Sequence, residues 1–236
     1  MRSVVTGFLF ALSSVCLAGN IDQLQNINQG QFRLLSEDLG AALSYKPLAP
    51  AAPLGIAGFD IGAEVSATKL RNPAILDQAT SGNTPSWLVV PRIEAQKGLP
   101  FDIDIGLTYS KVPGSNIDLW GGELRYAILE GSTTMPAIAV RGSYTKLTGV
   151  DQLDFSTKGL DLSVSKGFLF ISPYAGLGKI WVSSTPKGVP TLSDESFSMN
   201  KFFGGANIAL GVVSFDLEAD RTGDAWTYSG KLALRF

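Results

Sequence analysis

The last eleven residues of the chain place the strongest constraint on its fold, because apolar and polar side chains alternate there up to the final residue. Side chains of a β-strand point alternately to its two faces. One face carries Trp226, Tyr228, Gly230, Leu232, Leu234 and Phe236. The opposite face carries Thr227, Ser229, Lys231, Ala233 and Arg235. The chain therefore ends on a two-faced strand that suits an apolar environment on one side and water on the other.

Segments with the same two-residue period recur along the chain. Residues 59–68, 101–110 and 213–220 are the clearest examples, and each carries carboxylates on one face. The full set predicts ten strands, at 54–69, 86–97, 101–112, 116–129, 136–147, 152–166, 168–184, 194–210, 211–222 and 224–236. The alternation is irregular at 153–162 and 173–181, so the inward or outward facing of these two stretches stays open.

The same pattern indicates a membrane protein that crosses the bilayer with strands. After residue 18, no window approaches the roughly 18 to 20 consecutive apolar residues of a membrane-spanning helix. Helices and closed barrels are the two structures that pair every backbone polar group within a bilayer. We therefore expect an all-β fold, a transmembrane antiparallel up-and-down β-barrel of about ten strands at residues 54–236, as a monomer. A soluble exported β-sandwich is the alternative.

Residues 1–18 are predicted to be a secretory signal peptide. Arg2 supplies the positive charge, residues 4–15 are mostly apolar, and the small Ala18 precedes the expected cleavage point. A lipidated Cys16 is an alternative, but its flanking residues do not fit the lipidation pattern. Because Cys16 is the one cysteine of the chain, cleavage after residue 18 leaves an exported protein without disulfides or thiols.

The connections between the predicted strands fall into two groups. Those after even-numbered strands are short, whereas the two longest, 71–85 and 184–195, follow odd-numbered strands. Outer-membrane barrels have short periplasmic turns and longer external loops. This pattern predicts that both termini lie on the periplasmic side.

The segment between the signal and the barrel, residues 19–53, is expected to be periplasmic or to plug the lumen. Residues 31–45 place Phe32, Leu35 and Leu39 at helical spacing, which predicts a short amphipathic helix. Three prolines then end regular structure before the first strand. Two hypotheses stay open for the helix: it only shields its own apolar stripe, or it is a plug whose displacement opens the barrel.

Polar strand faces are expected to line the barrel interior with acids and bases. The predicted lumen cluster consists of Asp60, Glu64, Arg92, Glu94, Asp102, Asp104, Glu123, Arg125, Arg141, Asp216, Glu218 and Lys231. The same parity places Asp161, Lys201, Asp220 and Arg235 in the lumen. Ten strands enclose little more space than the eight whose interior side chains fill, which favours a packed, salt-bridged lumen. A water-filled lumen whose carboxylates favour cations is the alternative.

The residue types of the chain argue against catalysis. It contains no histidine, which excludes Ser-His hydrolase arrangements and the usual histidine metal sites. Carboxylates do alternate along strands, as at Asp102 and Asp104, but any water-facing strand shows this pattern. We therefore expect no catalytic, cofactor-binding or metal-binding residues, and no enzyme. With 19 Lys and Arg against 21 Asp and Glu, and no basic tract, we expect no nucleic-acid partner.

Aromatic residues lie near the ends of the predicted strands. They are Trp87, Tyr109, Trp120, Tyr126, Phe168, Phe170, Trp226 and Phe236. The interfacial girdles of membrane barrels occupy such positions, so anchoring in the bilayer is the preferred interpretation. An aromatic platform for a ligand is the alternative.

In its signal, its two-faced strands and its final segment Tyr228-Ser-Gly-Lys-Leu-Ala-Leu-Arg-Phe236, the chain resembles the small outer-membrane β-barrel proteins of Gram-negative bacteria. Residues 119–131 and 158–167 look like a proteobacterial group of such proteins of unassigned function. The resemblance implies a location in the outer membrane, in contact with its lipid. It also implies that Tyr228, Gly230, Leu234 and Phe236 form the assembly signal read by the barrel-assembly machinery.

Two classes of function follow. The first is a structural or surface-interaction protein with a largely packed polar lumen, whose loops 71–85 and 184–195 bind a surface partner. The alternative is a narrow or plugged, porin-like channel for small or hydrophobic solutes.

Overall fold

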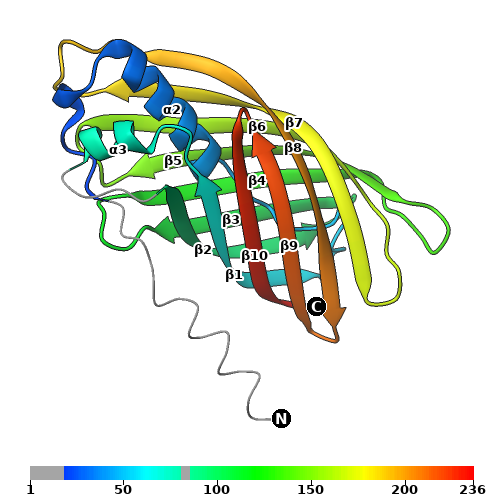
Figure 1. Cartoon of the computed structure of the whole chain (residues 1–236). Coiled ribbons are helices and arrows are strands. Elements are labelled where there is room, and N and C mark those ends of the chain that lie inside the picture. Colours follow the sequence, from blue (N-terminus) through cyan, green and yellow to red (C-terminus); the bar gives the residue numbers. More distant parts are fainter. Residues whose placement is uncertain (1–18, 81–85) are drawn as a thin grey trace, which may run out of the picture.

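The two-faced segments of the sequence form strands that close into a barrel (Figure 1). The computed structural model describes residues 19–80 and 86–236. The predicted signal peptide and the last part of loop 71–85 lie outside the described residues. The strands are β1 Phe59–Lys69, β2 Trp87–Leu99, β3 Ile103–Lys111, β4 Asp118–Leu129, β5 Ala137–Thr148, β6 Leu153–Ser165, β7 Ile171–Pro186, β8 Glu195–Leu210, β9 Val213–Thr222 and β10 Ala225–Arg235. The helices are η1 Leu24–Asn26, α2 Gln29–Leu43 and α3 Pro73–Ala79.

Hydrogen bonds between the first and last strands close the barrel. β1 pairs with β10 over ten residue pairs, and every other strand pairs with its neighbours in sequence. Pairing along a closed wall satisfies the backbone polar groups within the protein, as a bilayer requires. The predicted antiparallel up-and-down barrel of ten strands is therefore confirmed. The first strand begins at Phe59 rather than at residue 54, because the Gly58 N–H donates to the Gly55 carbonyl in a turn (2.9 Å).

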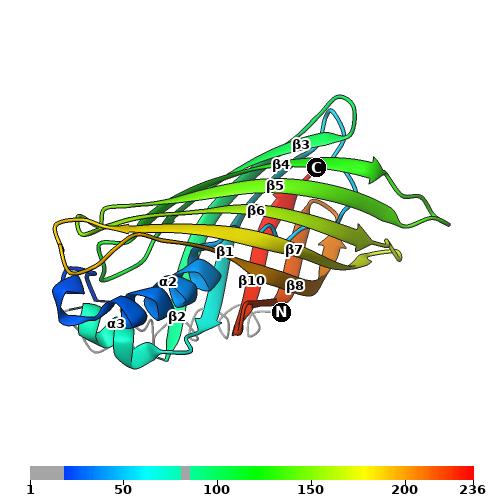
Figure 2. The same cartoon turned by 90° about the horizontal axis from the view of Figure 1, so that it is seen from above.

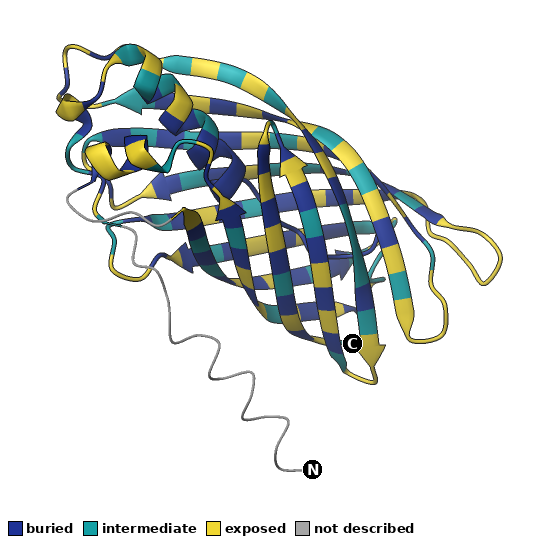
Figure 3. Cartoon of the chain, viewed as in Figure 1, coloured by how far each residue is buried: buried dark blue, intermediate teal, exposed yellow. Residues whose placement is uncertain are grey.

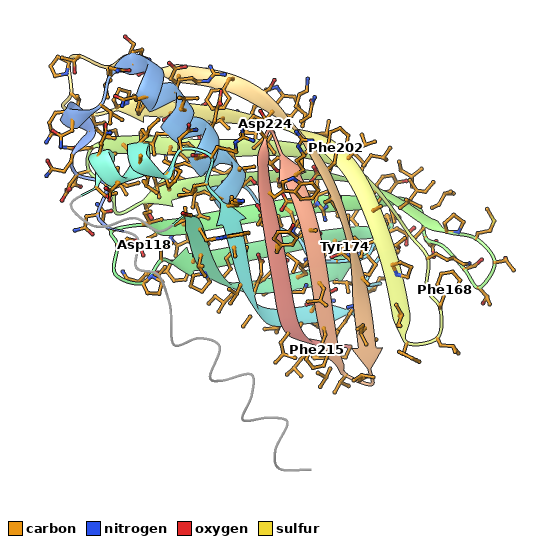
Figure 4. The ribbon with its side chains drawn as sticks, in the orientation of Figure 1. Asp118, Phe168, Tyr174, Phe202, Phe215 and Asp224 are labelled. Carbon is orange, nitrogen blue, oxygen red and sulfur yellow. The ribbon has the colours of Figure 1, made fainter. Side chains whose placement is uncertain are left out.

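The barrel has two distinct ends. Connections after odd-numbered strands lie at one end, which we name the loop rim; η1 and α3 lie there with the start of α2 (Figures 1 and 2). Connections after even-numbered strands lie at the other end, the turn rim, together with the C-terminus (Figure 1). Figure 4 labels Asp118 and Asp224 toward the loop rim and Phe168 at the turn rim. No helix among residues 19–80 and 86–236 has the length and apolar character needed to cross a membrane.

The outer wall is apolar over most of its height. Exposed and buried residues alternate along the strands (Figure 3). The side chains that face outward include Leu107, Leu177 and Leu217, which are 71%, 56% and 61% exposed. An apolar surface of this extent on a soluble protein would promote aggregation, whereas the hydrocarbon of a bilayer solvates it.

The predicted girdle residues fall into two groups on this outer wall. Those toward the loop rim are Trp87, Tyr109, Trp120 and Trp226. Those toward the turn rim are Tyr126, Phe168, Phe170 and Phe236. The rings of Tyr109 and Trp120 lie 4.5 Å apart, centroid to centroid. Two aromatic bands that flank an apolar band match the two interfaces of a membrane.

The inner wall has two zones. In the half nearest the loop rim, apolar side chains of the strands and helices form one core, which includes Phe155 and Val182. Nearer the turn rim, charged and hydroxyl side chains face the lumen. The structure also answers the two open questions of facing, because Phe155 points into the core whereas Lys179 and Trp181 are exposed on the outer wall.

Candidate functional site: a lumen filled by the N-terminal segment

The described chain begins at the loop rim, at the opposite end of the barrel from Phe236. Ile21 forms a β-bridge with Thr80 in the β1–β2 connection, and its N–H donates to the Asn116 side chain in the β3–β4 connection (3.1 Å). Phe236 instead pairs with Phe59 at the turn rim. The prediction that both termini lie on one side is therefore wrong for the residues described. The chain passes through the whole lumen before β1 begins.

Helix α2 enters the barrel from the loop rim. The Asn28 side chain accepts the Gln31 N–H (3.0 Å), and the Gln31 side chain accepts the Asn28 N–H (2.9 Å), which forms a capping box. The helix spans 29–43 rather than the predicted 31–45. It ends at Leu43, four residues before Pro47, which cannot continue a helix.

The apolar face of α2 is part of the core inside the barrel. Phe32, Leu35, Leu39 and Leu43 are each at most 1% exposed and belong to the core cluster formed with the strands. Gly40 lies where a Cβ atom would be only 2.8 Å from both Met199 and Val182. The helix therefore packs against the β7–β8 wall as closely as its backbone permits.

Polar contacts fix α2 at the loop rim. The Ser36 and Ser184 hydroxyls lie 2.8 Å apart, with Ser36 also donating to the Phe32 carbonyl. The Asp38 carboxylate accepts the backbone N–H groups of Arg71 (3.0 Å) and Asn72 (2.8 Å), just before α3. Burial raises the pKa of Asp38, and these hydrogen bonds offset only part of that effect.

Residues 44–53 continue from α2 as extended chain through the polar half of the lumen. We name residues 29–53 the lumenal segment. Residues 44–51 are buried without interruption. An extended chain cannot satisfy its own backbone carbonyls, so other groups must donate to them. Here Lys201 Nζ donates to the Tyr45 carbonyl (3.2 Å), and the Arg125 guanidinium donates to the Pro50 carbonyl (2.7 Å). The wall is thus built to hold this particular stretch of backbone.

Lys46 makes the one ion pair between the extended residues 44–53 and the described wall. Its Nζ lies 2.8 Å and 2.9 Å from the two carboxylate oxygens of Asp220, and both side chains are 0% exposed. The Tyr45 hydroxyl donates to Glu94 nearby (3.3 Å). Reasoning from strand parity missed Lys46, because it lies outside the strands. A single lysine within the apolar and proline-rich run 41–53 was the available signal.

The structure places most of the predicted lumen cluster inside the barrel. The buried, inward-facing members are Asp60, Glu64, Arg92, Glu94, Asp104, Glu123, Arg125, Arg141, Asp216, Glu218 and Lys231. Asp102 is the exception, because it lies in the β2–β3 turn rather than on a strand. That tight turn requires left-handed backbone at Phe101 (φ 66°) and Asp102 (φ 58°), which ends the alternation before β3.

Pairs of opposite charge fill the polar zone around the lumenal segment. Arg92 lies 2.8 Å from Glu64, and its guanidinium also donates to the Ala42 carbonyl at the end of α2 (2.9 Å). A guanidinium nitrogen of Arg125 likewise lies 2.6 Å from a carboxylate oxygen of Asp104, and the same guanidinium donates to the Pro50 carbonyl. Each arginine thus joins a wall carboxylate to the backbone of the segment.

Acids nevertheless exceed bases on the inner wall. The buried acidic residues of the described strands are Asp60, Glu64, Glu94, Asp104, Glu123, Asp161, Asp216, Glu218 and Asp220. The buried bases of the same strands are Arg92, Arg125, Arg141, Lys201 and Lys231. Both carboxylate oxygens of Glu123 and of Glu218 accept no hydrogen bond of standard geometry from the described residues. Without the lumenal segment, the wall would attract cations and water.

The residues of the predicted assembly signal lie on the outer face of β10 and just after it. Tyr228, Leu234 and Phe236 are 53%, 53% and 65% exposed, and Gly230 is on the same face. The Phe236 ring lies 5.7 Å from that of Phe59, so the last residue contacts the first strand at the closing seam. Recognition of these residues by the assembly machinery stays a prediction.

Chemistry of other kinds has little support in the geometry. Within residues 19–80 and 86–236, no three histidine, cysteine, aspartate or glutamate side chains are grouped so that they could hold a metal ion. The buried carboxylates are engaged mainly with arginine and lysine. The arrangement is suited to holding a polypeptide inside a barrel.

The fold and the filled lumen define a transmembrane β-barrel that contains its own N-terminal segment. No protein-family model and no curated protein matches the chain. Among solved structures, the N-terminal β-barrel domain of Pseudomonas aeruginosa OprF is similar, with 12% identity, 75% of this chain and 97% of that chain covered, and a TM-score of 0.39.

Two further solved structures are similar to the same extent. The translocator domain of the autotransporter NalP from Neisseria meningitidis has 8% identity, covers 88% of this chain and 94% of its own, and has a TM-score of 0.43. The outer membrane protein Omp33 of Acinetobacter baumannii has 6% identity, 75% and 97% coverage, and a TM-score of 0.32. Similarity at these values reaches no further than the barrel, and the resemblance to one proteobacterial group stays a prediction.

Proposed function

We propose that the protein is an outer-membrane barrel that its lumenal segment keeps closed, and that it acts through a non-enzymatic, surface-interaction role at the loop rim. The predicted signal peptide, the apolar outer wall and the long connections after odd-numbered strands support this location and orientation. In this orientation the loop rim faces the cell exterior.

The packing of α2 is the observation that carries the proposal. Phe32, Leu35, Leu39 and Leu43 are removed from water inside the barrel. Complete burial of such a side chain contributes about 1.5–3 kcal/mol, so withdrawal of α2 would cost roughly 6–12 kcal/mol from these four alone. The lumen therefore suits a closed barrel better than a resting channel.

The loop rim supplies the surface for a partner. There η1, α3 and the start of α2 form a layer over the end of the barrel, joined by contacts such as Gln31 to Gln78 (3.1 Å) and Gln29 to the Ser193 carbonyl (3.2 Å). Most of the exposed side chains of this layer are polar, among them Gln25, Asn26, Arg71, Gln78 and Ser193. A hydrated polar surface of this kind fits a polar macromolecular partner.

Conductance of the full chain in planar bilayers tests the proposal. Ser36→Cys/Ser184→Cys would tether α2 to β7 by a disulfide, because the two hydroxyls are 2.8 Å apart and no other thiol follows the predicted signal. We expect no channel activity from the unmodified protein or from either redox form of the variant. Channels that occur in the unmodified and reduced proteins and disappear on oxidation would refute a closed barrel.

A gated channel is the second candidate, and the acid excess of the inner wall favours it. If a signal at the loop rim withdraws the lumenal segment, a wall with more carboxylates than bases would line a path that prefers cations. Deletion of residues 19–50 provides the open reference for this test. Cation-selective channels in the deletion variant would support gating, and heat-modifiable migration of that variant shows that its barrel is folded. A folded deletion variant that forms no channels would exclude gating for ions.

A further inference from the structure

The outer wall of β6 and β7 changes from apolar to basic at one level of the barrel. On β6, the outward positions run from Val164 and Leu160 near the turn rim to Lys158 near the loop rim. On β7, the change falls between Leu177 and Lys179. Both lysines are exposed. The two strands therefore place a pair of cations on the surface that faces the membrane.

The strand register brings these lysines together. Lys158 pairs with Trp181, and Leu160 pairs with Lys179, so the two lysines are diagonal neighbours on the same face. Diagonal neighbours in an antiparallel pair lie about 7–8 Å apart. That spacing lets two flexible ammonium groups converge on one anion.

Lys158 and Lys179 differ from Lys111 and Lys187, which also lie near the loop rim, because they have no acidic partner among the described residues. Lys111 Nζ lies 3.2 Å from a carboxylate oxygen of Asp118, and Lys187 Nζ lies 3.1 Å from a carboxylate oxygen of Asp154. No ion pair or hydrogen bond engages the side chain of Lys158 or Lys179 within residues 19–80 and 86–236. Their positive charge is left for a group outside the protein.

Aromatic side chains flank the pair. Tyr144 on β5 is paired with Lys158 from one side, and Trp181 on β7 is paired with it from the other. Both rings are 44% exposed on the outer wall. Tyrosine and tryptophan prefer the level of lipid headgroups, where one end of the ring is apolar and the other is hydrated.

The height of the pair above the turn rim also fits a headgroup level. Nine residues separate Phe170 in the turn-rim aromatic band from Lys179. At about 3.3 Å per residue and a strand tilt of about 35–45°, this is about 21–24 Å along the membrane normal. The apolar band of a membrane barrel is about 25 Å tall. The lysines thus lie where hydrocarbon gives way to phosphate.

We propose that Lys158 and Lys179, flanked by Tyr144 and Trp181, bind the phosphate-bearing headgroup of an anionic lipid in the leaflet nearest the loop rim. Charge complementarity identifies the occupant, because a lipid phosphate is the anion that a bilayer holds at this depth. The aromatic rings would contact the adjoining glycerol and upper acyl region. The site lies on the outer wall and is independent of the lumenal segment.

Lipid binding by the full chain in mild detergent tests the site. Dioleoyl phosphatidylglycerol is titrated against the protein and followed by native mass spectrometry, with dioleoyl phosphatidylcholine as the zwitterionic comparison. Lys158→Gln/Lys179→Gln should weaken phosphatidylglycerol binding about thirtyfold, since a lysine near such a charge contributes about fivefold. Each single variant should lose about fivefold, which keeps the test informative if the double variant folds poorly.

A matched double variant controls for net charge. Lys111→Gln/Lys187→Gln removes two exposed lysines that have acidic partners, and it should change binding by less than about threefold. Equal losses in the two double variants would overturn a specific site. Equal affinity for the two lipids would also overturn it. Displacement of the lipid by an equimolar amount of inorganic phosphate would show a free-anion site and contradict the assignment to a lipid headgroup.

Discussion

Replacing Lys46 with methionine removes the charge that pairs the extended part of the lumenal segment with the wall, while most of its volume is kept. Lys46 and Asp220 are both 0% exposed, and Nζ lies 2.8 Å from the nearer carboxylate oxygen. The substitution leaves Asp220 with a hydrogen bond from the Thr222 hydroxyl (2.8 Å) but without its cation. A buried carboxylate in that condition is strongly destabilised.

The expected magnitude follows from the burial of the pair. Loss of one partner of a buried ion pair costs about 3–5 kcal/mol, because it leaves an uncompensated charge, whereas replacement of both partners by apolar residues is often neutral. Lys46→Met should therefore lower the free energy of unfolding by about 3–5 kcal/mol. Lys46→Met/Asp220→Leu should remain within about 1–2 kcal/mol of the unmodified protein, the residual cost being the unpaired Thr222 hydroxyl.

Urea unfolding of the refolded barrel in detergent or liposomes measures both variants. At a slope of about 2 kcal/mol per molar urea, the single variant should shift the midpoint down by about 1.5–2.5 M and the double variant by less than about 1 M. Protease digestion should also reveal residues 44–53 earlier in the single variant. If Lys46→Met costs less than about 1 kcal/mol, or the double variant costs as much as the single one, the pair does not hold the segment as we describe.

Two further predictions concern α2. Gly40→Ala should lower the free energy of unfolding, because overpacking against Met199 and Val182 costs about 1–3 kcal/mol and the better helix propensity of alanine recovers at most about 1 kcal/mol. The exposed Gly30→Ala gains only the propensity and should stabilise the same helix. Thermal melting compares the two variants, and equal shifts in melting temperature would contradict the close packing of Gly40. The raised pKa of Asp38 means that the folded protein holds its proton more tightly than the unfolded chain. The contribution of Asp38 to the free energy of unfolding is therefore greatest below pH about 4 and is lost as the pH rises through its raised pKa. Asp38→Asn should flatten this dependence in urea midpoints measured from pH 4 to 8, and unchanged slopes would show that another group titrates.

The wall of the barrel could be predicted because the facing of a strand is a local property. A period of two residues assigns each side chain to one face without knowledge of its neighbours. The inward facing of Glu64 and Arg125 and the exposure of Leu234 follow from parity alone. Parity was insufficient at Asp102, where turn geometry replaced the strand, and near Phe155, where an apolar residue faces inward because that half of the lumen contains a helix.

The path of residues 19–53 was not predictable in the same way. An amphipathic stripe at Phe32, Leu35 and Leu39 predicts a helix that must cover its apolar face, but several surfaces could do so. Two of the strands that pack against α2, β7 and β10, are distant in sequence, and side chains such as Val182 form the core with α2 only after the barrel closes. The partner of Lys46 is 174 residues away, at Asp220.

Local periodicity was enough to specify a ten-stranded wall with an apolar outer face and charged side chains on its inner face, since it decides which way each side chain points. Only the folded barrel specified that the N-terminal segment starts at the loop rim, fills the lumen and leaves at the turn rim before β1. It also decided that Lys158 and Lys179 share one site on the outer wall. These features depend on strand register and on contacts between distant residues, which closure of the barrel creates and which no local pattern contains.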